Sequence, residues 1–245
     1  MLNSFLTIFT PRRPNDIVGT YATSGMTFTY PALLTNVTYR QRFGDDSYEA
    51  TERTMVNRFV KASDTVWELG GSIGVVAVIT NKILEPSEAT RHVVIEANPL
   101  LISFLARNMQ VNNAQFVIEY GVVGDKAFYG FTSTMLTSGR VDEGTDRHDA
   151  SRGFVVPGIS IDYLLARYGN PSVVIMDIEG SEFAFIENYL QRMTSLRCLI
   201  VEFHTHVGGL PLVESARATL TGAGLNLVES CFDGANYTDV WQRAN

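Results

Sequence analysis

The sequence predicts an α/β fold: a mostly parallel sheet with helices on both faces and an antiparallel strand from a C-terminal hairpin. Three observations predict it. From residue 48 onward, short apolar runs rich in β-branched residues alternate with segments of helical periodicity, which is typical of parallel βαβ units. A glycine-rich turn follows the first such run, at residues 70–74. Asp233-Gly234 separates two strand-like runs near the C-terminus, and this pair favours a tight hairpin.

The composition excludes several classes of protein. Of the 245 residues, 45% are hydrophobic and 18% are charged, as in an ordinary globular domain. The net charge of −7 leaves no basic surplus for nucleic acid or an anionic membrane. No run approaches the ~18–20 apolar residues of a membrane span, and the N-terminal stretch lacks the basic start of a signal peptide. Cys198 and Cys231 lie in apolar runs, so we expect buried, reduced thiols and a cytoplasmic protein.

The pattern of the chain changes after residue 47. Residues 1–47 are rich in Thr, Tyr and Pro, and we expect short strands or irregular structure that packs on the main domain as an extension or cap. The main domain, 48–245, opens with a helix in YEATERTMVNRFVKA, where Met55 and Phe59 share one helical face. The strand-like run TVWELG follows, and the glycine turn behind it opens the next helix.

The alternation then continues to the C-terminus. We expect further strands at 91–97, 114–120, 173–176, 196–204, 225–232 and 237–244, and further helices at 99–112, 160–169, 181–193 and 211–222. Pro99 suits a first helical turn, and Gly169 suits a helix end. Residues 124–158 interrupt the pattern between the third and fourth strands, and their polar run 138–153 suits a lid or recognition loop.

The glycine turn and two acids nearby predict a cofactor. In ELGGSIG the turn lies between a strand and a helix N-terminus, where backbone N–H groups can approach a ligand closely. Glu68 precedes the glycines, and its carboxylate would repel a pyrophosphate but attract an ammonium group. Glu96 ends the next strand, where an acid can accept both hydroxyls of a ribose. A ribose and an ammonium without a pyrophosphate favour S-adenosylmethionine over NAD.

A second group of acids ends the fourth and fifth parallel strands. Asp177 and Glu179 follow the apolar run 173–176, and Glu202 and His204 end the next strand. In a parallel sheet these strand ends meet at one edge, where ligands bind. We expect Asp177 and His204 to flank an acceptor hydroxyl, one of them acting as base, with Glu179 beside them. A divalent cation held by Asp177, Glu202 and His204 is a second hypothesis.

We expect structural rather than catalytic roles for two further ionisable residues, Glu182 and His92. Glu182 begins the helix after Asp177, where a carboxylate stabilises the helix dipole. His92 precedes a strand, and we expect it at the surface.

The ordered set of motifs resembles the FkbM-type methyltransferase family over about residues 48–206. The stretches that carry the resemblance are ELGGSIG, VIEANP, NMQVNN, VVGD, SIDYLL, IMDIEGSEFAFIEN and LIVEFH. One departure is Ser72, where that family usually has Asn.

The resemblance implies a class I S-adenosylmethionine-dependent methyltransferase with a Rossmann-like sheet. Members of that family are largely O-methyltransferases that act on hydroxyls of sugars, polyketides and other secondary metabolites. The turn residues would hold the methionine end of the cofactor, Glu96 its ribose, and Gly121 and Val122 its adenine. The full set of cofactor residues that we expect is Glu68, Gly70, Gly71, Ser72, Gly74, Glu96, Ala97, Gly121, Val122 and Asp177.

Other functions remain open at this point. The same fold could methylate nitrogen, since fold alone does not decide the acceptor. An NAD-dependent oxidoreductase would be expected to have a third glycine and no acid before the turn, so Glu68 disfavours this function. A cofactor-binding module without catalysis is disfavoured by the retained Asp177, Glu179 and His204. We expect a small molecule or glycan as substrate, with a homodimer possible.

Overall fold

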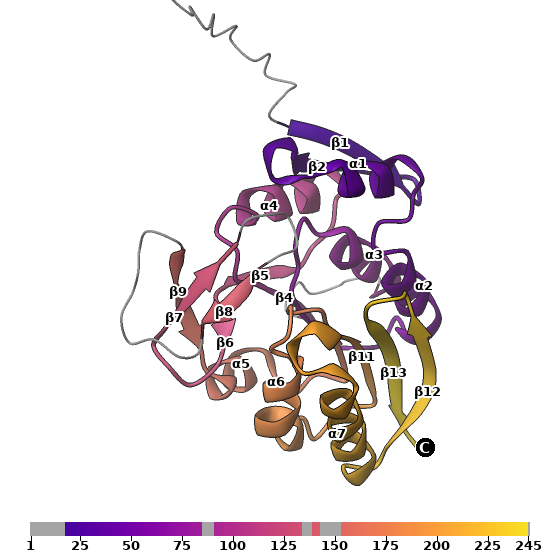
Figure 1. The fold of residues 1–245 in the computed structure, drawn as a ribbon, viewed down its shortest axis with the longest axis vertical. Coiled ribbons are helices and arrows are strands. Elements are labelled where there is room, and N and C mark those ends of the chain that lie inside the picture. The colour runs from indigo at the N-terminus through magenta and orange to yellow at the C-terminus, as the bar shows by residue number, and fades with distance from the viewer. Residues whose placement is uncertain (1–17, 85–90, 134–138, 143–152, 245) are drawn as a thin grey trace, which may run out of the picture.

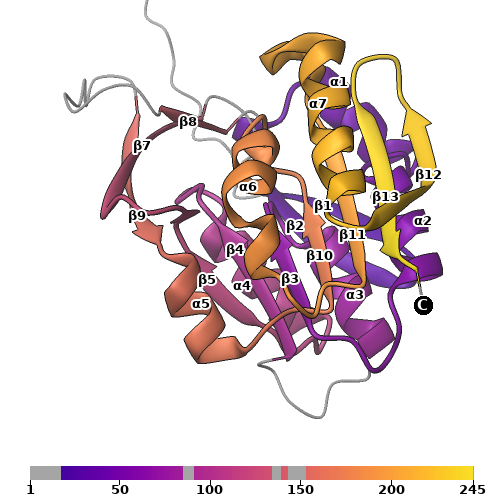
Figure 2. The ribbon, with the colours of Figure 1, turned by 90° about the horizontal axis from the view of Figure 1, so that it is seen from below.

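The computed structural model describes residues 18–84, 91–133, 139–142 and 153–244. Its centre is a seven-stranded sheet with helices on both faces (Figures 1 and 2). The strand order is β12-β13-β11-β10-β3-β4-β5. Strands β11, β10, β3, β4 and β5 are parallel, whereas β13 runs antiparallel to both of its neighbours. The predicted fold class, including the antiparallel C-terminal hairpin strand, is confirmed.

The inner strands β3, β4, β10 and β11 are short and mostly apolar, as expected of strands that are covered on both faces. The bounds of the sheet strands are β3 Val66–Leu69, β4 His92–Glu96, β5 Val117–Tyr120, β10 Val173–Met176, β11 Cys198–Phe203, β12 Leu225–Phe232 and β13 Tyr237–Arg243. The β12–β13 hairpin forms one edge of the molecule, drawn in yellow in Figures 1 and 2.

Helices divide between the two faces according to where their apolar residues point. Buried residues of α2, α3 and α4 pack into one apolar cluster with Val66, Val94 and Ile175 of the sheet. Buried residues of α5, α6 and α7 pack into the other cluster with Trp67 and Val174. The helix bounds are α2 Ala50–Phe59, α3 Val75–Leu84, α4 Ile102–Val111, α5 Ile161–Tyr168, α6 Glu182–Tyr189 and α7 Gly209–Gly222, with short 3-10 turns η4 Leu190–Arg192 and η5 Thr205–Val207.

The N-terminal segment packs on α4. It consists of β1 Val18–Thr23, β2 Met26–Pro31, the 3-10 turn η2 Ala32–Leu34 and α1 Val37–Gly44. The buried Asn108 side chain accepts a hydrogen bond from the N–H of Thr29 at 2.7 Å and donates one to the Thr29 carbonyl at 2.8 Å. The Asn108 amide thus pairs with the backbone of β2 and fixes the hairpin to α4. The assignment of 1–47 as an extension or cap of the main domain stays a prediction, and residues 1–17 lie outside the described part.

A small second sheet fills the interruption between β5 and β10. Its strand order is β6-β9-β7-β8, with bounds β6 Val122–Val123, β7 Phe128–Thr132, β8 Arg140–Asp142 and β9 Phe154–Ile159. It lies at the side opposite the C-terminal hairpin (Figures 1 and 2). Of the polar run that suits a lid, residues 143–152 lie outside the described residues, and the lid role stays a prediction.

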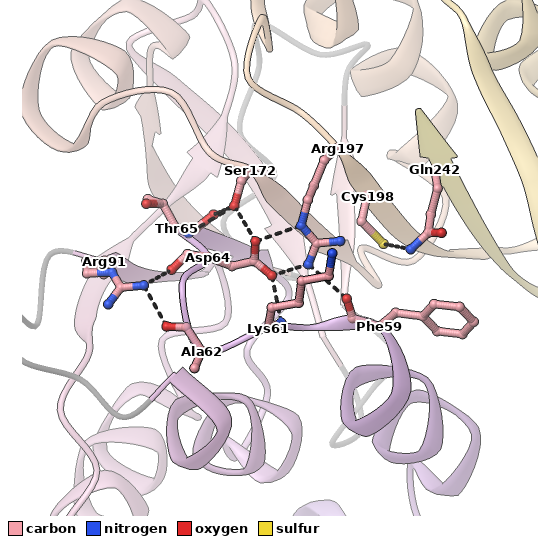
Figure 3. A network of polar contacts seen from close by, with 10 residues as sticks. All are labelled: Phe59, Lys61, Ala62, Asp64, Thr65, Arg91, Ser172, Arg197, Cys198 and Gln242. Carbon is pink, nitrogen blue, oxygen red and sulfur yellow. Dashed lines mark hydrogen bonds and ion pairs between the residues drawn. The ribbon is translucent and has the colours of Figure 1, made fainter. Parts of the chain in front are cut away.

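One carboxylate joins the starting ends of the central strands (Figure 3). Asp64, just before β3, accepts hydrogen bonds from Arg197, just before β11, and from the Ser172 hydroxyl, just before β10. Its carbonyl accepts from Arg91, just before β4, at 2.7 Å. Burial opposes ionisation of Asp64, but the Arg197 guanidinium and the other donors outweigh it and hold its pKa below the usual value.

Two expectations about burial were wrong. His92 is fully buried rather than at the surface, because β4 is an interior strand whose first residue already faces the packed helices. Cys198 is buried as expected, but Cys231 is exposed, since it lies on the edge strand β12. Within the described ranges, no helix has the length and apolar character needed to cross a membrane.

We expect Asp64→Asn to destabilise the fold by about 2–4 kcal/mol, because it leaves the Arg197 charge half-buried without its partner. The stabilising pair exists above the pKa of an unfolded Asp, so the difference between wild type and variant should shrink as the pH falls below about 4. Urea unfolding across this pH range measures both effects. Asp162→Asn, which breaks the exposed pair with Arg192, is the control and should change stability by less than ~1 kcal/mol.

Candidate active site

A cavity of about 360 Å³ opens at the carboxyl edge of the parallel sheet. Its walls come from the residues that follow β3, β4, β5 and β10, from α6 and from the small second sheet. Loops at this edge are the expected ligand site of an open parallel sheet. Phe131, Val141 and Phe185 add apolar surface to these walls. The cavity is therefore lined by both polar and apolar groups, as suits a cofactor with an aromatic ring.

Gly70 connects the glycine turn to the loop that carries Asp177. Its φ of +89° is a left-handed conformation, and an added Cβ would lie 1.8 Å from the carbonyl oxygen of Asp177. The Gly70 N–H donates to the carbonyl of Ile95, and the Asp177 N–H donates to the carbonyl of Leu69. Because the backbones meet so closely, only glycine fits here.

Glu96 holds the glycine turn from the side of β4. Its Oε2 accepts the N–H of Ser72 at 2.6 Å, and its Oε1 accepts the N–H of Asn98 at 2.6 Å. Burial raises the pKa of Glu96 to about 7 despite these backbone donors. Each oxygen retains a further lone pair. Since Glu96 also lines the cavity, its carboxylate can accept hydroxyl donors of a ligand there.

Ser72 occupies the position at which the sequence departs from the family pattern. Its φ is +46°, a left-handed conformation that Asn adopts more readily than Ser. The Ser72 hydroxyl lies 3.1 Å from the hydroxyl of the buried Tyr48, at the start of the main domain. The departure is therefore accompanied by a side-chain contact that holds the turn.

Glu68 lies behind the cavity wall rather than in it. It is buried on the sheet face that packs against α2 and α3, and its Oε2 is 3.4 Å from His92 Nε2. Burial alone raises the Glu68 pKa well above its usual value, and it lowers the His92 pKa to about 3. Both groups are therefore held neutral, and an ammonium group in the cavity has no direct path to Glu68.

The turn after Asp177 is folded back on itself. Glu179 has φ of +54° and Gly180 has φ of +105°, and a Cβ at Gly180 would lie 2.4 Å from Val207. Glu182, fully buried at the start of α6, closes the turn by accepting the N–H of Ile178 at 3.0 Å and of Gly180 at 3.1 Å. This turn brings Glu179 toward the end of β11.

His204 joins the turn to the end of β11. Its Nδ1 is 2.9 Å from Glu182 Oε1, and its Nε2 is 3.6 Å from Asp177 Oδ1 and 3.5 Å from Glu179 Oε2. Burial lowers its pKa, but the hydrogen bond to Glu182 and the charges of Glu182, Glu179 and Glu202 outweigh burial and raise the pKa to about 9. The side chain is only 5% exposed, so it reaches the cavity through the two carboxylates.

Asp177 and Glu179 line the cavity and are poorly compensated. Burial, followed by the charges of Glu202 and Glu179, raises the pKa of Asp177 well above its usual value. Burial raises the pKa of Glu179 to about 7, against the pull of His204. Strongly interacting groups of this kind titrate as a set, and such perturbed carboxyls in a cavity are typical of functional sites.

Several residues near this group have no counterpart in the sequence prediction. Burial raises the pKa of Tyr39, from the N-terminal helix α1, to about 12, and Glu179 and Asp177 add to the rise. Burial also raises the pKa of Glu52 to about 7, with Glu202 adding to it. No motif singled out these two positions, because the packing of α1 and α2 decides how close they lie to these acids.

The predicted cofactor and catalytic residues separate into two sets. Those that line the cavity are Gly70, Ser72, Glu96, Ala97, Gly121, Val122, Asp177 and Glu179. Those outside its walls are Glu68, Gly71, Gly74, Glu202 and His204. Glu202 accepts the Asn236 amide at 2.8 Å instead of joining His204. The group whose donor atoms converge is Asp177, Glu179 and His204.

We expect Gly70→Ala to lower the free energy of unfolding by more than about 2 kcal/mol, because left-handed strain is joined by the collision with Asp177. Gly25→Ala is the matched control: Gly25 also has a left-handed φ, of +74°, but an added Cβ meets open space. It should cost only about 1 kcal/mol. Denaturant unfolding of both variants measures the difference, and equal costs would contradict the close contact.

Several solved structures share this fold. Trm5b from Pyrococcus abyssi has a TM-score of 0.54 at 10% identity, over 92% of this chain and 56% of its own. Trm5 from Methanocaldococcus jannaschii, solved with adenosine, has 0.52 at 11%, over 94% and 56%. TYW2 from P. horikoshii, solved with MeSAdo, has 0.52 at 9%, over 94% and 73%. The chain thus spans little more than half the length of the first two, and identities this low show the fold alone.

The sequence itself matches a family model. No curated protein matches the chain, but the methyltransferase FkbM domain matches residues 69–225, which is more than half of its length. That range covers the glycine turn, Glu96, the Asp177 turn and His204. The chain therefore belongs to the FkbM methyltransferase family, and its fold is that of the class I S-adenosylmethionine-dependent methyltransferases.

Proposed function

We propose that the protein is an O-methyltransferase that acts on a hydroxyl of a sugar, glycan or other secondary metabolite. The observation that carries the proposal is the position of Asp177 and Glu179, which line the cavity on one side and face the buried His204 on the other. An oxygen acceptor must lose a proton, and this group is placed to accept it. A cytoplasmic location and an acceptor other than nucleic acid stay predictions of the sequence.

The cavity suits S-adenosylmethionine, which supplies an electrophilic methyl group on its sulfonium. Glu96 would accept the two ribose hydroxyls, with Ala97 beside it. Gly121 and Val122 would border the adenine, and the close Gly70 turn would let the backbone approach the methionine end. The volume of about 360 Å³ falls within the usual range of small-molecule sites.

Asp177 is the proposed proton acceptor. It lines the cavity, whereas His204 lies behind it, so an acceptor hydroxyl can reach Asp177 but not His204. His204 and Glu179 would set its position and charge. The site thus needs to orient the hydroxyl toward the methyl group and remove one proton, which is most of what methyl transfer requires.

The choice of oxygen over nitrogen rests on this surplus of carboxylates and on the family resemblance. A tRNA m1G37 methyltransferase from M. jannaschii shares the fold, and so does aTrm5, which was solved in complex with tRNALeu; these two structures raise RNA as another acceptor. The net charge of −7 and the acidic group at the cavity disfavour a polyanion. An acceptor screen with tritiated S-adenosylmethionine should therefore include sugars, amines and tRNA, and transfer to tRNA alone would contradict the proposal.

We expect S-adenosylhomocysteine to bind with micromolar affinity and NAD not to bind, as measured by calorimetry. Glu96→Gln should weaken the binding at least tenfold, or ~1.4 kcal/mol, because one ribose acceptor becomes a donor. Glu214→Gln, which changes a 65% exposed side chain on α7, is the matched control. A preference for NAD would overturn the cofactor assignment.

We expect Asp177→Asn to reduce the methyl-transfer rate by about 10²–10⁴, because the amide cannot accept the proton. His204→Gln should also reduce the rate, with S-adenosylhomocysteine affinity unchanged within about threefold since His204 lies outside the cavity walls. Single-turnover rates with an acceptor from the screen measure this. A folded, fully active Asp177→Asn protein would show that the base lies elsewhere.

A further inference from the structure

The donor atoms of Asp177, Glu179 and His204 are arranged like ligands of one metal ion. All three lie within 4.8 Å of one another. The Nε2 of His204 is 3.6 Å from Asp177 Oδ1 and 3.5 Å from Glu179 Oε2. These distances are longer than the ~2.7–3.2 Å of a good N–H···O hydrogen bond. They match the ~3.4 Å between two ligands of a tetrahedral ion with bonds of ~2.1 Å.

Glu182 prepares His204 for this role. Its Oε1 already accepts the N–H groups of Ile178 and Gly180, so it acts as an acceptor toward His204 Nδ1, at 2.9 Å. When the imidazole is neutral, as a metal ligand must be, its proton therefore lies on Nδ1 and the lone pair of Nε2 faces the two carboxylates. A buried carboxylate behind a histidine is the usual way in which proteins orient a metal-ligating imidazole.

One buried atom at this place lacks a hydrogen-bond partner. Among the described residues, Asp177 Oδ1 is buried and has no hydrogen bond. The His204 side chain beside it is only 5% exposed, and its Nε2 lies 3.5 and 3.6 Å from the two carboxylates. A neutral Nε2 that faces two anionic oxygens is repulsive unless a cation, either a proton or a metal ion, lies between them.

We propose that Asp177 Oδ1, Glu179 Oε2 and His204 Nε2 bind one divalent cation, which assists the proposed methyl transfer by holding the acceptor hydroxyl. A set of two carboxylate oxygens and one imidazole nitrogen suits Zn²⁺ or Mn²⁺ better than the all-oxygen sites of Mg²⁺ and Ca²⁺. Glu179 replaces Glu202 in the ligand set expected from the sequence, because Glu202 is bonded to Asn236.

The site is placed where a cation would be useful. Asp177 and Glu179 line the cofactor cavity, so an open coordination position would face the reacting groups. A metal ion lowers the pKa of a hydroxyl that it coordinates. The Asp177 side chain is 32% exposed although Oδ1 is buried, so its remaining surface can still receive the proton of that hydroxyl.

The test is titration of the purified, metal-free full chain with Mn²⁺ alone, followed by the electron paramagnetic resonance of the free ion. We expect one saturable site per chain. Glu179→Gln and His204→Gln should weaken it at least tenfold, and Glu182→Gln should weaken it about 10–100-fold through loss of orientation. Glu214→Gln should leave it unchanged. Glu179 is 26% exposed, so its variant keeps the test independent of whether a buried substitution folds.

Only the role of the cation in methyl transfer rests on the proposed function. Binding of the cation and binding of the cofactor can therefore fail separately. Titration with S-adenosylhomocysteine in the same samples makes them distinguishable, since Glu96→Gln should lose that ligand and keep Mn²⁺. Binding of S-adenosylhomocysteine without any Mn²⁺ or Zn²⁺ site would overturn the metal site and leave an imidazolium between the carboxylates. Equal Mn²⁺ affinity in wild type, Glu179→Gln and His204→Gln would overturn it as well.

Discussion

The contact on which the rest of the structure depends is the carboxylate of Asp64 at the starting edge of the sheet. The carboxylate accepts hydrogen bonds from Arg197 and Ser172, which precede β11 and β10, and the Asp64 backbone carbonyl accepts one from Arg91, which precedes β4. Parallel strands have no hairpin to set their register, so their alignment comes from such contacts and from packing. Strands that start together and have similar length also end together. Contacts at the starting ends of the strands therefore determine how their carboxyl ends line up beside the cavity.

The carboxyl edge in turn couples two loops that the sequence keeps far apart. The backbone of Gly70 contacts that of Asp177, and Glu96 holds the glycine turn from the next strand. A shift of the cofactor turn must therefore move the loop that bears the proposed base. This rigid contact fits a reaction in which most of the catalytic effect comes from orientation, and only a proton needs to be taken up.

Glu182 shows how one buried acid can serve several purposes. Its place at the start of α6 suits the helix dipole, as the sequence indicates. It also closes the turn after Asp177 and holds the His204 ring, so it joins α6, β10 and β11 in one hydrogen-bonded group. The result is a histidine whose outer nitrogen faces two carboxylates at the cavity. The charged groups at this edge are therefore brought together by the backbone turn that Glu182 closes.

The site could be predicted in part because its chemistry is local in sequence. The glycine turn, the acid ending β4 and the acids after β10 each belong to a strand and the residues that follow it, and parallel topology collects such positions at one edge. Packing decided what no motif could indicate. Tyr39 and Glu52, on helices far away in the sequence, are close enough for the acids at this edge to raise their pKa values, and His92 turns inward because its strand is interior.

The sequence by itself determined the α/β fold, the family and the edge where the site lies, since periodicity and strand-end motifs are short-range signals. Only the tertiary structure decided which of these acids meet. It placed Glu68 behind the sheet beside His92, and it chose Glu179 over Glu202 as the neighbour of His204. The reason is the left-handed turn at Glu179 and Gly180, which packs against Val207, a residue far along the chain that no local pattern can indicate.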